Sequence, residues 1–224
     1  MTHPIDPIGE AGLRFYSKVS ASISHEIKNS LAVINESAGY LEDVTRMAKK
    51  GMTVDMNRLE TLAGSMLKQV QRANTIVKNM NRLAHSLDDP AVRTDLNTLI
   101  ELMLHLSQRT TVTRGFKVSA AFSEPPVIIV THPFFVENLI WLILNFAMDA
   151  TGDAQSIELQ PVKTTSGAKI NFTGLDQLTQ NAFENFQTEP VTLMVSALKS
   201  RLQADENKGM IILNLPDDIS QPAQ

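Results

Sequence analysis

The chain has 224 residues, of which 43% are hydrophobic and 20% are charged, a composition typical of one large or two small globular domains and not of a disordered chain. With 20 basic and 24 acidic side chains the net charge is −4, which favours neither nucleic acid nor an anionic membrane as a partner. The absence of cysteine excludes disulfides and thiolate metal sites.

The first predicted helix begins just after Gly9 and ends at about Lys49. His25 lies about 200° round the helix from its apolar stripe, so it is predicted to face water. Asn29 shares that face one turn further on, and Glu26 is offset from His25 by about 100°. The stripe recurs at steps of three and four and consists of Val19, Ile23, Ile27, Leu31, Ile34, Ala38 and Leu41.

A second helix is predicted from about Val54 to Leu87, after a turn at Gly51. Its apolar positions alternate at steps of four and three, which indicates a heptad seam. The two helices should form an antiparallel hairpin, and pairing with a second copy would cover the remaining apolar surface in a dimeric four-helix bundle. The seam consists of Leu59, Ala63, Met66, Val70, Ala73, Val77, Met80, Ala84 and Leu87.

The pattern of apolar residues changes after Pro90, where we expect helices and short strands to alternate. We expect a mainly α helical hairpin in residues 1–90 and, in residues 91–224, an α+β two-layer sandwich of one sheet backed by helices. The elements expected after Pro90 are a helix from Thr94 or Asp95 to Gln108, strands at 116–122 and 127–130, a helix at 133–151, a hairpin of strands 157–162 and 168–172, a helix at 191–202 and a strand at 210–215.

The N-terminus has no apolar signal core, and Asn145 interrupts the longest apolar run. We therefore expect a cytoplasmic protein that contacts neither membrane nor nucleic acid. A zinc site is not expected at His25, because the pattern His-Glu-x-x-Asn lacks a second histidine one turn on.

Residues 24–31, with the sequence SHEIKNSL, resemble the histidine box of the dimerisation and phosphotransfer domain of two-component histidine kinases. Ser30 stands where that box commonly has proline. The second region resembles the ATP-binding domain of the same family in its element order and in the segments DLNTLIELML, FKVSAAF, NLIWLILNFAMDAT and MIILNLP. The resemblance implies that His25 accepts phosphate, that Glu26 and Asn29 assist it, and that a response regulator receiver domain is the partner.

The ATP-binding domain departs from the family in its apolar helix. Active members carry an asparagine there, in the ending Asn-Ala-x-Asp-Ala, which holds Mg²⁺ against the triphosphate. Aligning residues 147–150 with that ending places Phe146 at the asparagine position, while Asp149 conforms. Asn145 is adjacent, but its side chain points about 100° away.

Two further nucleotide contacts of the family are missing. The Asp-x-Gly-x-Gly box should follow strand 168–172, but Thr173 replaces the aspartate and Gly174 is its one glycine. The turn at 188–192 has no glycine and carries a proline and a glutamate where phosphates would lie. We predict a degenerate domain with little or no ATP binding, no intrinsic cofactor and no metal.

The histidine alone can still exchange phosphate. A neutral imidazole attacks phosphorus with one nitrogen while the other keeps its proton, and Glu26 is the predicted partner of that proton. By the resemblance, Asn29 would position water in the reverse, phosphatase direction. The receiver supplies its own Mg²⁺ and lysine, so phosphate transfer needs no ATP on this chain.

The leading hypothesis is a dimeric histidine phosphotransferase that passes phosphoryl groups between receiver domains through His25. One alternative is a divergent sensor kinase that binds ATP through Asn145 and autophosphorylates His25. The other is a pseudokinase scaffold that binds a response regulator without chemistry.

Overall fold

The computed structural model describes residues 6–153 and 155–221. The chain divides into two compact units, one made of residues 20–82 and the other of the chain up to residue 19 together with the chain from residue 83 onward. The first turns of the long N-terminal helix therefore belong to the second unit. The expected domain bounds, 1–90 and 91–224, stay a prediction.

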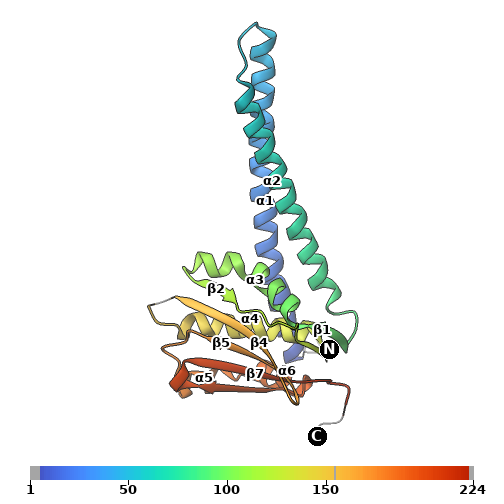
Figure 1. Cartoon of the computed structure of the whole chain (residues 1–224), viewed down its shortest axis with the longest axis vertical. Coiled ribbons are helices and arrows are strands. Elements are labelled where there is room, and N and C mark those ends of the chain that lie inside the picture. Colours follow the sequence, from blue (N-terminus) through green and yellow to red (C-terminus); the bar gives the residue numbers. More distant parts are fainter. Residues whose placement is uncertain (1–5, 154, 222–224) are drawn as a thin grey trace, which may run out of the picture. The chain divides into compact units, whose positions relative to one another are not determined.

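The two long helices are α1 (Pro7–Lys49) and α2 (Met56–His85), and they form the predicted antiparallel hairpin (Figure 1). α1 begins slightly earlier than predicted because an Asp6 oxygen accepts a hydrogen bond from the Gly9 N–H at 3.0 Å, which caps the helix. Asp55 caps α2 in the same way. Both long, strongly periodic elements are confirmed.

The inward face of the hairpin differs from the predicted stripes. Leu31 is 54% exposed, and Val70 and Val77 are 44% and 46% exposed. In a hairpin each helix has one neighbour, so it can bury only part of a wide apolar face. The stripes were therefore partly wrong for the single chain. The buried or half-buried positions of the hairpin include Ile27, Ser30, Ile34, Ser37 and Leu41 on α1 and Leu62, Met66, Gln69, Ala73, Ile76, Asn79 and Met80 on α2.

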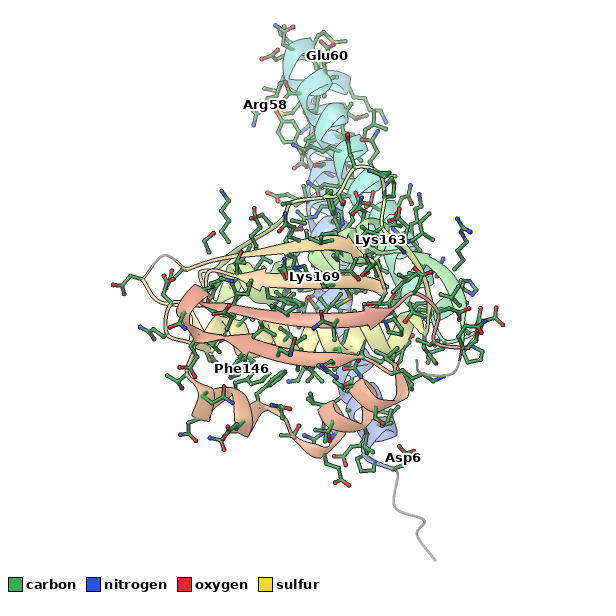
Figure 2. All side chains as sticks on the ribbon, turned by 60° about the horizontal axis from the view of Figure 1, so that its bottom comes forward. Asp6, Arg58, Glu60, Phe146, Lys163 and Lys169 are labelled. Atoms are coloured by element: carbon green, nitrogen blue, oxygen red, sulfur yellow. The ribbon has the colours of Figure 1, made fainter. Side chains whose placement is uncertain are left out.

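The second unit is built on a five-stranded sheet in the order β2-β4-β5-β7-β6, in which β2 and β4 are parallel and the other pairs are antiparallel. Helices α3 (Leu96–Thr113) and α4 (Pro133–Ala150) cover one face. Figure 2 looks onto the other face, where Lys169 lies. The strands are β2 (Lys117–Ala120), β4 (Ser156–Thr164), β5 (Gly167–Thr173), β6 (Arg201–Asp205) and β7 (Met210–Pro216).

A second, two-stranded sheet pairs β1 (Val92–Asp95) with β3 (Ile128–Thr131). The prediction of one sheet was therefore wrong, and β1 was missed because its four residues lack an apolar alternation. Asp95 caps α3 as predicted, since its side chain accepts a hydrogen bond from the Asn97 N–H at 2.9 Å. On its other side β3 bonds to the C-terminal segment, with Val130 N–H donating to the carbonyl of Asp217 at 2.8 Å.

The region after β5 also differs from the prediction. A short helix α5 (Gln180–Phe186) was missed, and α6 (Glu189–Ala197) ends earlier than expected. The helix cannot continue because Lys199 adopts a positive φ of 48°. The residues after it form the edge strand β6, in which Leu202 pairs with Leu213 of β7. A 3₁₀ turn, Glu206–Lys208, joins β6 to β7.

Among the described residues, one helix has the length and composition to cross a membrane, and it is α4, whose mean hydropathy is 1.2 over 18 residues. Within the fold 61% of that window is buried, as expected for a core helix that packs against α3 and α6. The absence of membrane contact stays a prediction.

Thr131 at the end of β3 and Asn138 in α4 have buried polar side chains, and His132, the N-cap of α4, is half-buried. Asn138 and Thr131 are both 0% exposed. Neither amide atom of Asn138 nor the hydroxyl of Thr131 has a hydrogen-bond partner among residues 6–153 and 155–221. Burial lowers the pKa of His132, so this imidazole is neutral at pH 7. Unpaired buried groups of this kind cost stability.

Replacing Asn138 with Leu is expected to raise the free energy of unfolding by about 1–3 kcal/mol, because an apolar side chain of similar volume removes an unpaired buried amide. Urea denaturation measures the change. The matched control is Asn145→Leu on the same helix, where the amide donates to the carbonyl of Trp141 at 2.7 Å and its loss should not stabilise. A less stable Asn138→Leu protein would contradict this prediction.

Candidate functional site

The histidine box lies on the helical unit, which is made of residues 20–82, near the middle of α1. His25 and Asn29 are both exposed and lie one turn apart, as predicted. On the opposite side of the same turns Ile23 and Ser30 are 7% and 2% exposed, so burial of that side directs the histidine toward solvent. An exposed imidazole is accessible to a second protein. The catalytic roles of these side chains stay a prediction.

Glu26 has a partner that the sequence did not reveal. Its carboxylate oxygen Oε2 lies 3.3 Å from Nη2 of Arg72 on α2, and the Glu26 side chain is 16% exposed. The carboxylate next to His25 is therefore held by a cation across the hairpin. Arg72 was missed because it comes from the other helix, 46 positions along the chain, and no local pattern marks it. The predicted role of Glu26 toward the imidazole proton remains untested.

The Glu26–Arg72 ion pair is expected to contribute less than about 1 kcal/mol to stability, because the Arg72 side chain is 58% exposed and water screens the attraction. A double-mutant cycle with Glu26→Gln and Arg72→Met, followed by urea denaturation, measures the coupling. The control pair is Glu42–Arg46, whose side chains are 76% and 62% exposed, with an expected coupling of about 0.3–0.5 kcal/mol. A coupling energy of about 3 kcal/mol would mean that the ion pair is shielded from water.

The position that should hold Mg²⁺ in an active kinase is filled by an aromatic stack. Phe146 of α4 packs on Phe186 of α5, with ring centroids 4.6 Å apart and planes tilted by 19°. Asn145, the neighbouring amide, donates to the carbonyl of Trp141 within its own helix. The ring at 146 offers no metal ligand, and the adjacent amide is oriented by its NH2 group toward the backbone of its own helix.

Asp149 is also engaged within the protein. Its carboxylate forms an ion pair with the guanidinium of Arg114, the C-terminal cap of α3. The same guanidinium lies 3.5 Å from the carbonyl of Asn145 and over the ring of Phe116. Asp149 therefore helps join α3 to α4.

Gly174 is required by strand packing. It has a φ of +91°, and a Cβ there would lie 2.1 Å from the carbonyl oxygen of Ser156. The next residue, Leu175, donates its N–H to the carbonyl of Gly209 at 3.0 Å. Thr173 is half-buried, and its hydroxyl lies 3.4 Å from the carbonyl of Glu158. The remnant of the glycine box therefore serves the end of the β4–β5 hairpin.

The N-terminus of α6 is poorly suited to phosphate. Glu189 is in the first turn and is exposed, which places a negative charge at the positive end of the helix dipole. Pro190 removes one backbone N–H from the same turn. Thr188 is the N-cap but forms no side-chain capping bond. Both the charge and the missing N–H act against an anion at this position.

The predicted site residues fall into two groups on different units. The histidine box lies in the helical unit. The degenerate nucleotide positions 145–149 and 173–174 lie in the other unit, made of the chain up to residue 19 and from residue 83 onward, which we call the sandwich unit. Within the described part of the chain, no three His, Cys, Asp or Glu side chains gather into a metal site.

Comparison with known proteins gives fold-level matches. No protein-family model and no curated protein matches the sequence. The histidine kinase ThkA, solved in complex with the response regulator protein TrrA, aligns with 94% of this chain and 64% of its own, at 15% identity and a TM-score of 0.50. A nucleotide-free catalytic domain of ThkA aligns with 59% of this chain and 99% of its own, at 10% identity and a TM-score of 0.50. The chain has a histidine kinase-like fold.

A further histidine kinase, AdeS of Acinetobacter baumannii, aligns with 88% of this chain and 98% of its own at 12% identity, with a TM-score of 0.48. The histidine kinase-like fold confirms, at the level of the fold, the resemblance inferred from the sequence. At these identities the likeness concerns the fold. The chemistry depends on the side chains that this chain itself carries.

Proposed function

We propose that this protein is a histidine phosphotransferase of a two-component phosphorelay, which carries phosphoryl groups to and from receiver-domain aspartates on His25 without using ATP. The observation that carries the proposal is the Phe146–Phe186 stack at the position where a kinase-like fold needs an asparagine for Mg²⁺. The exposed His25 and Asn29 keep the histidine box accessible at the same time.

Phosphoryl transfer between a receiver aspartate and His25 requires no nucleotide. A ring nitrogen of His25 attacks the phosphorus of a receiver aspartyl phosphate, so an N–P bond forms while the P–O bond to the aspartate breaks and the carboxylate leaves. The other ring nitrogen keeps its proton through this step. The receiver's Mg²⁺ and lysine neutralise the charge of the moving phosphoryl group. The reverse reaction delivers the group to a second receiver.

The neighbours of His25 have proposed supporting roles. Glu26, positioned by Arg72, offsets the positive charge that develops on the imidazole. Asn29, one turn away on the same face, orients water for hydrolysis of the phosphorylated receiver. Both residues act beside the nucleophile and do not replace it.

We propose that the helical unit dimerises into a four-helix bundle. α2 carries a second apolar stripe that the hairpin leaves exposed, including Leu67, Val70 and Val77 at 63%, 44% and 46% exposure. Pairing with a second copy would bury this stripe together with Leu31 of α1. Exchange with receiver domains would place such a dimer in the cytoplasm.

The experiment that tests the loss of ATP needs no partner. The full-length protein is incubated with Mg²⁺ and γ-labelled ATP, and acid-labile label is sought on His25. We expect none, because Phe146 supplies no metal ligand and Glu189 repels phosphate. Label that disappears in His25→Gln would establish the kinase alternative and overturn the proposal.

A further inference from the structure

The sandwich unit contains a groove away from the degenerate nucleotide positions. It has a volume of about 520 Å³ and lies between the first turns of α3 and residues 122–126, which lead from β2 to β3. None of its lining residues belongs to the histidine box or to the positions aligned with ATP contacts.

The walls of this groove are held in place by internal hydrogen bonds. The Asn97 amide donates to the carbonyl of Ser123 at 2.8 Å and accepts from the N–H of Ser123 at 3.3 Å. Asp95 caps α3 and accepts from the Thr98 hydroxyl at 3.0 Å. The two Asn97–Ser123 bonds join the loop to the helix and the Asp95 bonds fix the first turn of α3, so a ligand would meet a preformed surface and lose less entropy on binding.

The groove combines apolar and acidic groups. Phe122 is 49% exposed, and Pro125 and Pro126 line the same groove. Glu101 and Glu124 are exposed, and in residues 6–153 and 155–221 neither carboxylate has an ion pair at 4.0 Å or less. The lining includes no Lys, Arg or His. An occupant with the matching chemistry has an apolar side chain beside a cation.

We propose that this groove is a docking site for a segment of the response regulator that presents an apolar side chain next to Lys or Arg. The inference rests on the proposed function, because that function supplies a protein partner that must dock repeatedly. The two carboxylates disfavour phosphates and nucleotides as occupants, and they attract a basic segment from a distance. Burial of Phe122 then adds apolar contact once the charges have met.

The first test uses a defined probe on the full-length protein. The probe is the peptide acetyl-Lys-Leu-Ala-Lys-Leu-Ala-Lys-amide, compared by titration calorimetry with the same peptide carrying Glu for Lys. We expect the cationic peptide to bind at least about tenfold more tightly, because only its charge matches Glu101 and Glu124. Equal affinity for the two peptides would overturn the proposal.

Variants then localise the binding. Glu101→Gln with Glu124→Gln, and separately Phe122→Ser, should each weaken binding of the cationic peptide by about tenfold. The matched controls change exposed groups elsewhere in the unit, Glu184→Gln and Val112→Ser, the latter at a position 66% exposed, and should leave affinity unchanged. Wild-type affinity in the groove variants would place the peptide elsewhere and refute the docking site.

A second measurement separates this inference from the proposed function. Purified phosphorylated receiver domains are titrated against wild type and the groove variants, and the initial rate of phosphate arrival on His25 is followed. We expect the apparent KM for the receiver to rise about tenfold in the groove variants with the maximal rate unchanged. An unchanged KM would refute docking at the groove and leave the phosphotransferase standing. If no receiver exchanges phosphate with the wild type, the proposed function fails and the peptide titration still decides the groove.

Discussion

Replacing His25 with Gln is expected to lower the rate of phosphate acceptance from a phosphorylated receiver by at least about a thousandfold, to the background rate. Gln keeps a polar side chain on an exposed helical position but has no nucleophilic ring nitrogen, so the N–P bond cannot form. The measurement is transfer of label from the phosphorylated receiver to the full-length protein in the presence of Mg²⁺. Because His25 is exposed, the variant should fold normally.

The matched control for this experiment is His85→Gln. The His85 side chain is 76% exposed, and its Nδ1 lies 2.8 Å from an oxygen of Asp88. The His85→Gln variant should accept and release phosphate at the wild-type rate. Transfer that survives in His25→Gln would mean that another side chain carries the phosphoryl group. Transfer absent from the wild type, with receiver binding intact in His25→Gln, would favour the scaffold alternative.

Replacing Gly174 with Ala is expected to lower the free energy of unfolding by about 3 kcal/mol or more. A Cβ at this position would lie 2.1 Å from the backbone oxygen of Ser156, and the φ of +91° is strained for any residue with a side chain. Since the obstacle is backbone, β4 and β5 must separate at this end to make room. The change is measured by urea denaturation followed by far-UV circular dichroism.

Gly64→Ala is the control for the same chemical change. Gly64 lies inside α2, and a Cβ added there would meet nothing from the rest of the described chain within 4 Å. Alanine should therefore raise stability by about 0.5–1 kcal/mol through helix propensity. If Gly174→Ala were as stable as the wild type, the end of the β4–β5 hairpin would have to adopt another backbone path. In that case strand packing would not explain the glycine, and the family's nucleotide box would be the remaining explanation.

The long helices could be predicted from the sequence because their signal is local. In α1 and α2 apolar residues recur with the helical period over 43 and 30 residues, which identifies a helix even where part of the stripe stays exposed. α4 is recognised as a strongly apolar segment that begins at Pro133. The same local periodicity places His25 and Asn29 on an exposed face. The resemblance of residues 24–31 to a histidine box needed no tertiary information.

The elements that were missed depend on distant partners. β1 has four residues, and its pairing with β3 comes from across α3. The residues near Leu202 follow an apolar helix and read as its continuation, yet they form β6 because pairing with β7 supplies backbone hydrogen bonds that a frayed helix end lacks. Strand assignment in short segments is decided by the neighbouring strand.

The features of the candidate functional site also divide into those that follow from the sequence and those that follow from the tertiary structure. The amino-acid sequence by itself predicts His25 as the phosphate acceptor and places Phe146 where the resemblance expects a metal-binding asparagine. Only the tertiary structure decided that Arg72 holds Glu26 and that Phe186 covers Phe146, at 3.3 Å between charged atoms and 4.6 Å between rings. Side-chain identity and helical phase are local properties of the chain, whereas ion pairs and ring stacks depend on which distant segments folding brings together.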